Sequence, residues 1–206
     1  MQVLGASINS SIHEAVNIIR AGGIVSHATE TCYGLACDFT NESAVRKVFE
    51  LKKRPEGMPI SALFPSVESA KEWVEWNEVA DRLADEYLPG PLTIVLPVRN
   101  VPHASCLVSR TLGIRISPHP VAQKLAELAE VPLSTTSANI HGGLNPYSVD
   151  DVISQFFVGA QHAVPGSQPE LILDSGKLPH ADPSTVVAIE NGKIKILRQG
   201  SIMIEL

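Results

Sequence analysis

Four basic side chains of the sequence fall where apolar runs end, and their chemistry suits the binding of a polyanion. Lys52 and Arg54 follow a predicted helix, while Arg115 and Arg198 close two predicted strands. Guanidinium and ammonium groups bind phosphates, and the planar guanidinium can also hold a carboxylate through two parallel hydrogen bonds. Loops and element ends on a rigid scaffold commonly carry function. The placement therefore predicts a cleft for a small anion such as a nucleoside triphosphate.

Hydroxyl and amide side chains occupy similar places and would orient such a ligand. Each segment alone is weak evidence, because Ser, Thr and Asn are ordinary turn formers. Thr29, Tyr33 and Thr136 are equally well interpreted as packing or turn residues, and Pro118-His119 as the start of a helix. Together with the cations, these side chains form five segments: 29–35, 52–55, 111–120, 135–139 and 184–187 with 198–200.

Motifs of several common chemistries are missing from the sequence. It contains no G-x-G-x-x-G, no G-x-x-x-x-G-K-[ST] and no G-x-S-x-G string. The seven histidines form no H-x-x-x-H pair, so a zinc site has no support. Cys32, Cys37 and Cys106 are odd in number without C-x-x-C spacing, which argues against a disulfide framework and favours buried small hydrophobes.

Helical and extended patterns alternate along the chain, which predicts one α/β domain with at least one antiparallel hairpin. Ser11–Glu14 forms a capping-box pattern, Asn41 is expected to cap the second helix, and Asn191-Gly192 predicts the hairpin turn. Helices are expected at about 11–21, 41–52, 67–76, 79–88 and 121–129, and strands at about 24–28, 35–39, 60–64, 92–97, 112–116, 132–136, 184–189 and 193–197.

Composition limits the class of protein. The 206 residues are 44% hydrophobic, with 16 Lys+Arg against 22 Asp+Glu and a net charge of −6. This supports a sizeable core, and no apolar run approaches the ~20 residues of a membrane span, so a cytoplasmic protein without membrane contact is expected. Most of the acid excess lies in 68–86. A locally positive cleft in an acidic protein suits a small nucleotide better than a long nucleic acid.

Read together and in order, the five segments resemble the YrdC family over about residues 10 to 200. The most specific elements are K-x-R, here Lys52 with Arg54, and S-x-N, here Ser137 with Asn139. The strings T-E-T-x-Y-G-L, P-G-P-L-T, R-x-x-x-H-P and S-T-V-V accompany them. The sequence is similar to the short form of the family, with residues 1–206 as a single domain.

The resemblance implies a twisted mixed sheet that contains antiparallel strands, with helices packed on it and an open concave groove. It implies a nucleotidyltransferase that makes L-threonylcarbamoyladenylate and pyrophosphate from L-threonine, bicarbonate and ATP, for the t6A37 modification of tRNA. Mg²⁺ is expected to accompany ATP, with no metal ligand assigned to the protein. Downstream tRNA-modifying proteins are expected to accept the adenylate.

Two other interpretations stay open. One is a module of the same fold that binds RNA or a nucleotide through the groove without turnover. The other, a carbamoyl-transfer accessory domain, would need neighbouring domains that this sequence does not contain.

The same resemblance implies roles for individual residues. Lys52, Arg54, Ser137 and Asn139 are expected to be catalytic. ATP would be held by Lys52, Arg54, Thr111, Ser137, Asn139, Asn145 and Arg198. Threonine would be held by Thr31, Arg115, Thr135 and Ser184.

Some positions depart from the family pattern or have two interpretations. Relatives often carry Asn, a polar or His residue, and Ser where this sequence has Met58, Leu63 and His141. The departures concern the outer nucleotide and threonine-hydroxyl contacts and leave K-x-R and S-x-N intact. Glu30 could help to order Mg²⁺ or could pair with a nearby cation.

Overall fold

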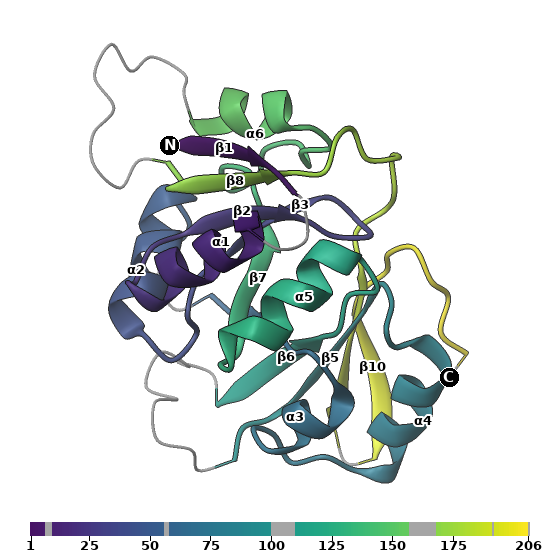
Figure 1. Cartoon of the computed structure of the whole chain (residues 1–206). Helices are drawn as coiled ribbons and strands as arrows, with labels where there is room; N and C mark the ends of the chain where they lie inside the picture. The colour runs from purple at the N-terminus through teal and green to yellow at the C-terminus, as the bar shows by residue number, and fades with distance from the viewer. Residues whose placement is uncertain (7–9, 56–57, 100–109, 157–167, 191, 206) are drawn as a thin grey trace.

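A mixed sheet of ten strands forms the centre of the computed structural model, which describes residues 1–6, 10–55, 58–99, 110–156, 168–190 and 192–205 (Figure 1). In spatial order the strands are β1 (Gln2–Gly5), β8 (Leu171–Asp174), β2 (Val25–Ala28), β3 (Tyr33–Ala36), β7 (Leu133–Ser137), β4 (Ser61–Leu63), β6 (Thr111–Arg115), β5 (Leu92–Pro97), β9 (Thr185–Glu190) and β10 (Lys193–Arg198).

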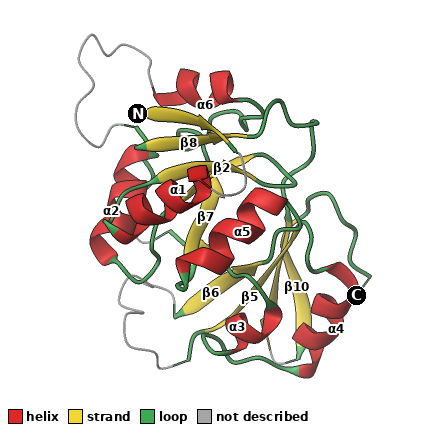
Figure 2. Ribbon diagram, in the orientation of Figure 1, coloured by secondary structure: helices red, strands yellow, loops and turns green. Residues whose placement is uncertain are grey.

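Parallel and antiparallel pairs are interspersed across the sheet. The pairs β1–β8, β8–β2, β4–β6 and β5–β9 are parallel, and the other neighbours are antiparallel. Parallel neighbours cannot be joined by a tight turn, and the two strands of each of these four pairs are separated in the sequence by helices and at least one other strand (Figure 2). The expected mixed α/β architecture is confirmed.

Helices cover the two faces of the sheet unequally. One face packs its alternate apolar residues, including Leu112 and Ile114, against buried side chains of α2 (Glu42–Leu51), α4 (Glu78–Tyr87) and α6 (Val149–Phe156), with α3 (Val67–Lys71) beside them. The other face carries α1 (Ser10–Arg20) and α5 (Pro120–Ala129), which bury Val25 and Leu63 (Figure 1). Because side chains alternate along strands, the remaining residues of β5, β6 and β9 on this second face have no covering helix. That uncovered part of the sheet becomes the floor of a cleft.

Several local predictions hold because a short-range interaction fixes them. Asn41 caps α2 by accepting a hydrogen bond from the Ala44 amide, and His119 caps α5 with Pro120 in its first turn. The strands β9 and β10 form the expected antiparallel hairpin, and Gly192 takes the positive φ of 71° that its turn requires. Residue 191 lies outside the described residues.

Other local predictions are wrong. Helix α1 begins at Ser10, so Ser11 lies inside it and does not form the expected capping box. The helix expected over 67–76 ends at Lys71, and the strand expected over 35–39 is Tyr33–Ala36. The elements β1, β8 and α6 had no prediction; two of them are four-residue strands, which are too short for periodicity to mark.

Candidate functional site

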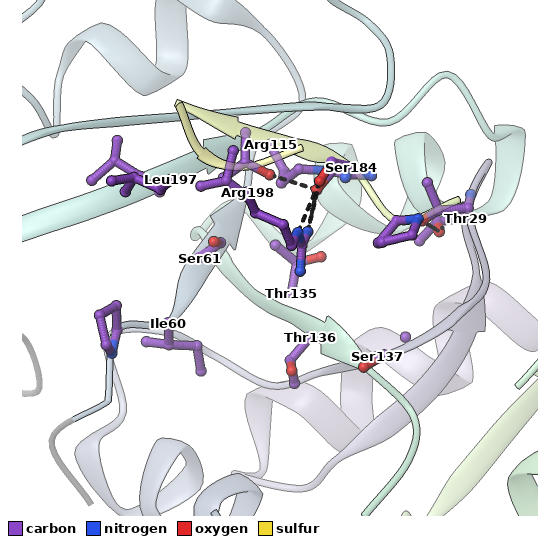
Figure 3. Close-up of a pocket in the computed structure, with 18 of the residues that line it drawn as sticks. Thr29, Ile60, Ser61, Arg115, Thr135, Thr136, Ser137, Ser184, Leu197 and Arg198 are labelled. Carbon is purple, nitrogen blue, oxygen red and sulfur yellow. Dashed lines mark hydrogen bonds between the residues drawn. The ribbon is translucent and has the colours of Figure 1, made fainter. Parts of the chain in front are cut away.

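A polar cleft of about 400 Å³ lies on the uncovered face of the sheet, within the size range of small-molecule sites (Figure 3). The loops after β2 and β8, the strands β4 to β7 and the β9–β10 hairpin all contribute to it. It is lined by Thr29, Thr31, Cys32, Gly34, Arg54, Pro59, Ile60, Ser61, Thr93, Val95, Thr111, Gly113, Arg115, Thr135, Thr136, Ser137, Asn145, Pro183, Ser184, Val186, Leu197 and Arg198.

Small side chains make the floor of the cleft. Ser61 and Gly113 are directly paired on β4 and β6, and Thr93 lies on the neighbouring β5. A Cβ at Gly113 would lie 2.4 Å from the Ser61 Oγ and 3.0 Å from the Thr93 Cγ2. Glycine at this position therefore keeps the floor open above the strands.

Arg198 and Ser184 form a hydrogen-bonded group on one wall. The Arg198 guanidinium donates to the Ser184 carbonyl oxygen at 2.8 and 3.1 Å and to the Ser184 Oγ at 2.9 Å (Figure 3). The Ser184 Oγ also lies 2.9 Å from the Thr93 Oγ1. This network joins the end of the hairpin to β5 and fixes a cation and two hydroxyls in one place.

Arg115 is a buried cation at the end of β6, with only 6% of its surface exposed. It donates through one Nη to the Glu30 Oε1, while the Ser117 hydroxyl donates to the Glu30 Oε2. Its Nε is buried and has no hydrogen-bond partner among the described residues. Of the two interpretations of Glu30, the observed contacts favour pairing with a cation.

Arg54 lies on the opposite side, in the loop after α2. One Nη donates to the Pro59 carbonyl oxygen at 2.5 Å, and the guanidinium lies 5.7 Å from the centre of the Phe49 ring. Burial lowers the pKa of Arg54 from its usual value. Burial, followed by the charge of Arg115, likewise lowers the pKa of Arg198.

The lining of the cleft carries positive charge. Three arginines line it, and no aspartate or glutamate is present among its described lining residues. Cations that repel one another in a partly buried space are stabilised by an anion placed between them. The lining is therefore chemically suited to an anion, although the chain as a whole carries a net charge of −6.

Lys52 does not line the cleft; it lies behind the cleft wall and is only 2% exposed. Its Nζ donates to the carbonyl oxygens of Ser137 and Asn139 and, at 3.1 Å, to the Asn139 Oδ1. Burial first, and then the charge of Arg54, lower the pKa of Lys52 to about 8. An ammonium group has three N–H donors, and all three have acceptors here.

Lys52, Ser137 and Asn139 form one hydrogen-bonded group, which we call the brace. Asn139, like Lys52, lies outside the cleft lining. Its Oδ1 accepts from the Ser137 hydroxyl at 2.6 Å, and its Nδ2 donates to the Gly143 carbonyl oxygen at 2.6 Å. The brace therefore couples the end of α2 to the loop after β7 and orients Ser137, which does line the cleft.

The turn after β2 is built around Thr29. Its Oγ1 donates to the Cys32 carbonyl oxygen at 2.7 Å and accepts from the amides of Thr31 and Cys32 at 3.2 Å each. The Thr31 Oγ1 lies 3.0 Å from the same hydroxyl. Thr29 thus has a turn-forming role, as one of its two interpretations predicted, and it presents Thr31 to the cleft.

The cleft also contains the thiol of Cys32. Burial raises its pKa to about 11, which outweighs the opposing charges of Arg115 and Lys52. Cys32 and Cys37 are both buried thiols outside any disulfide bond, in agreement with their interpretation as small hydrophobes. Cys106 lies outside the described residues.

The cleft brings together nine of the eleven residues to which the sequence assigned a role. They are Thr31, Arg54, Thr111, Arg115, Thr135, Ser137, Asn145, Ser184 and Arg198. Lys52 and Asn139 lie behind the wall. The departures Met58, Leu63 and His141 are not among the lining residues.

Sequence reasoning missed several floor residues, among them Ser61, Thr93 and Gly113. A signal for two of them was present, because Thr93 and Gly113 alternate with the buried apolar residues of their strands. Small or polar residues at every second position of an otherwise apolar strand indicate an uncovered face.

The described residues offer little to a protein-bound metal ion. No three His, Cys, Asp or Glu side chains among them are grouped so as to hold one. Both oxygens of Glu30 already have partners.

Among the described residues, no helix is long and apolar enough to cross a membrane.

Comparison with known sequences matches most of the chain to one family. Residues 17–200 match the Sua5/YciO/YrdC family model, which carries the description Telomere recombination. The chain is 35% identical over 185 residues to a protein of Methanocaldococcus jannaschii, with 89% of this chain and 83% of that protein aligned. It is 30% identical over 161 residues to threonylcarbamoyl-AMP synthase of Vibrio vulnificus, covering 75% of this chain and 84% of that enzyme.

Solved structures share the architecture. The Sua5 of Pyrococcus abyssi complexed with L-threonine superposes with a TM-score of 0.84 at 33% identity, over 97% of this chain and 57% of that protein. The chain thus spans little more than half the length of the Pyrococcus protein. Escherichia coli YciO superposes with a TM-score of 0.79 at 23% identity, over 97% of this chain and 94% of YciO, which supports the fold alone.

Proposed function

The chain belongs to the Sua5/YciO/YrdC family, and from this membership and the chemistry of the cleft we propose that it is a threonylcarbamoyl-AMP synthase. Relatives at 30% and 35% identity carry that name, and the Pyrococcus protein was solved with L-threonine. The observation that carries the proposal is the meeting of three arginines with a row of hydroxyls in a cleft lined by no described carboxylate. Such a site fits two anionic substrates, an amino acid carboxylate and a nucleoside triphosphate.

In the proposed reaction, the neutral threonine amine combines with bicarbonate to form a carbamate, and one water molecule is released. A carbamate oxygen then attacks the α-phosphorus of ATP, and pyrophosphate leaves. The protein contributes chiefly positioning and stabilisation of the negative charge that builds up on the phosphoryl oxygens. Fixed cations therefore matter more here than a general base.

We assign the two substrates to different parts of the cleft. Arg115 would hold the threonine carboxylate, because its fork can bind both oxygens, with the hydroxyls of Thr31, Thr135 and Ser184 around the amino acid. Arg54 and Arg198 would hold the ATP phosphates, with Thr111, Ser137 and Asn145 completing the nucleotide site. Lys52 and Asn139 belong to this proposal through Ser137, whose position their hydrogen bonds support.

Mg²⁺ is proposed to enter as part of the metal–ATP substrate. The lining residues include no carboxylate for it, so the phosphate oxygens would be its principal ligands. The metal would neutralise charge on the triphosphate as the bond to pyrophosphate breaks.

We further propose that residues 1–206 act as a single domain in the cytoplasm, where ATP is available. The continuous sheet from β1 to β10 supports the first point. The product would pass to a tRNA-modifying protein for the t6A37 modification.

One assay tests the proposed reaction. The protein is incubated with labelled bicarbonate, L-threonine, ATP and Mg²⁺, and pyrophosphate release and labelled adenylate are measured. Release that depends on threonine and bicarbonate is the expected result. Release without threonine would refute the synthase, and nucleotide or RNA binding without any release would favour the module that binds without turnover.

Arg54→Ala tests the phosphate side of the cleft. Loss of this cation should lower turnover by at least about tenfold, because it removes charge stabilisation during phosphoryl transfer. Circular dichroism should be unchanged, since Arg54 lies in a loop outside the helices and strands. Arg46→Ala is a matched control, because Arg46 forms an exposed pair with Glu42 on the neighbouring helix. Wild-type turnover in Arg54→Ala would exclude the assigned role.

A further inference from the structure

Glu30 is a buried carboxylate to which the proposed reaction gives no role. It lies in the turn after β2, next to Thr31, and is absent from the cleft lining. Its side chain is 15% exposed, and that of its partner Arg115 is 7% exposed. A carboxylate and a guanidinium removed from water to this degree interact far more strongly than a surface pair, provided that their hydrogen bonds are satisfied.

Both carboxylate oxygens of Glu30 already accept hydrogen bonds from neighbouring side chains. One oxygen accepts from Arg115 and the other accepts from the Ser117 hydroxyl. Ser117 is fully buried, and its Oγ also accepts from the His119 amide at the start of α5. Glu30 is thus connected through Ser117 to the start of α5, and this connection restricts the position of the Arg115 guanidinium.

A second cation, Arg198, lies near Arg115 in the cleft lining. The charge of Arg115 is among the causes that lower the pKa of Arg198, so the two guanidiniums repel each other. An arginine side chain also has about 2 kcal/mol of rotamer entropy to lose when it is fixed. The Glu30 carboxylate opposes both effects, since it attracts the guanidinium and holds it through one Nη.

We propose that Glu30 is a positioning residue that holds the Arg115 guanidinium toward the cleft and thereby sets selectivity for a substrate bearing a free carboxylate. This inference rests on the proposed binding of the threonine carboxylate by Arg115. Glu30 acts from behind the arginine and touches neither substrate. Its contribution falls on amino acid binding and leaves the phosphate side of the cleft unaffected.

The test compares the binding of L-threonine with that of L-threoninamide, which lacks the carboxylate charge, by titration calorimetry. Wild-type protein should favour L-threonine, and Glu30→Ala should reduce this preference by at least about tenfold, because an unanchored fork loses its bidentate geometry. Glu30→Gln, which keeps an acceptor for Arg115, should lose less. The KM for ATP should change by less than about twofold, which a general loss of structure would not permit.

A double-mutant cycle identifies the route of the effect. In an Arg115→Ala background, Glu30→Ala should change the preference by less than about twofold, because the residue through which it acts is gone. Glu130→Gln, which removes an exposed pair with Arg20, serves as a control with unchanged preference. If Glu30→Ala does not fold, the preference for L-threonine over L-threoninamide is compared for Glu30→Gln in the same two backgrounds.

The outcomes separate this inference from the proposed function. Binding needs no turnover, so a protein that prefers L-threonine through Glu30 but releases no pyrophosphate would refute the synthase and support the positioning role. A wild-type preference in Glu30→Ala, or an equal loss in the Arg115→Ala background, would overturn the role of Glu30. A wild-type protein with no preference for L-threonine would overturn it together with the assignment of Arg115.

Discussion

Lys52 shows how far the position of one side chain can change the interpretation of a motif. The family resemblance implied that Lys52 and Arg54 both hold the ATP phosphates. In the structure, Arg54 lines the cleft, whereas Lys52 lies behind the cleft wall. All three hydrogen bonds of the Lys52 ammonium go to Ser137 and Asn139. Two cations separated by one residue can therefore have different tasks.

Lys52→Met tests the brace. The substitution keeps the length of the side chain but removes the ammonium donor from the carbonyl oxygens of Ser137 and Asn139, while the Asn139 Oδ1 keeps only the Ser137 hydroxyl, so we expect a loss of unfolding free energy of about 2–4 kcal/mol. Urea unfolding measures it. A residue that served only as a phosphate ligand would behave in the opposite way: ATP affinity would fall with no loss of stability.

His27 is a buried titratable residue in the strand that precedes the Glu30 turn. Its Nδ1 donates to the Ala28 carbonyl oxygen, and its Nε2 is buried without a partner among the described residues. Burial is the main cause that lowers the pKa of His27 from 6.5 to about 4. The folded protein therefore holds this imidazole neutral at pH values where the unfolded chain binds a proton.

Stability should fall as pH drops through this window. Above pH 6.5 neither state protonates His27, whereas between pH 6.5 and 4 only the unfolded chain does, so the folded state loses up to about 3 kcal/mol. Urea unfolding at several pH values measures the slope. His27→Gln, which cannot titrate, should remove this part of it; parallel curves for both proteins would show that His27 is not held neutral.

At the scale of elements, the β9–β10 hairpin positions one wall of the cleft. Its last strand carries Leu197 and Arg198 into the lining, and Ser184 precedes its first strand. Thr185, the first residue of β9, is hydrogen-bonded to the segment that follows β10. Its Oγ1 donates to the Ile202 carbonyl oxygen and accepts from the Gly200 amide. The two ends of the hairpin are therefore held together beside the cleft.

Gly200→Ala should disrupt this wall. A Cβ at Gly200 would lie 2.1 Å from the Pro183 carbonyl oxygen and 2.6 Å from the Thr185 nitrogen, and backbone atoms cannot move aside cheaply. We expect a loss of about 2–3 kcal/mol in unfolding free energy and a larger relative loss of turnover, because Ser184 and Arg198 shift. Gly5→Ala is the control, since no atom lies within 4 Å of its Cβ; equal stabilities for the two variants would refute the crowding argument.

At the scale of the whole molecule, charge is separated between the two faces of the sheet. The acidic stretch 68–86 spans α3 and α4, whose buried residues pack on the face opposite the cleft. The three cleft arginines lie on the uncovered face. A negative molecule can therefore bind a small anion in its cleft and still repel a long polyanion over most of its surface.

This separation predicts different responses of two ligands. The KM for ATP should rise by roughly threefold between 50 and 300 mM salt, because screening weakens the partly exposed arginines. Single-stranded RNA without other substrates should bind more weakly than about 10⁻⁶ M at 150 mM salt, measured by fluorescence anisotropy. Tighter, steeply salt-dependent RNA binding would favour the RNA-binding interpretation.

The sequence by itself determined the class of fold, most of its longer elements and the residue types of the site. Helical periodicity, the Asn41 cap and the Asn191-Gly192 turn are local signals. Predictions from such signals hold in the folded protein because they depend on residues close in the sequence. The identities of Arg54, Arg115, Ser137 and Arg198 could be predicted because their motifs are written in consecutive residues.

Only the tertiary structure decided which of these side chains reach the cleft. Strand order and sheet pairing bring Glu30 to Arg115 across 85 positions and Lys52 to Ser137 across 85 positions, and no local pattern encodes such contacts. Burial and contacts then separate these side chains: Lys52 donates to Ser137 and Asn139, Glu30 pairs with Arg115, and Gly113 keeps the floor open. These outcomes depend on which face of the sheet is left without a helix, which is a property of the packed molecule.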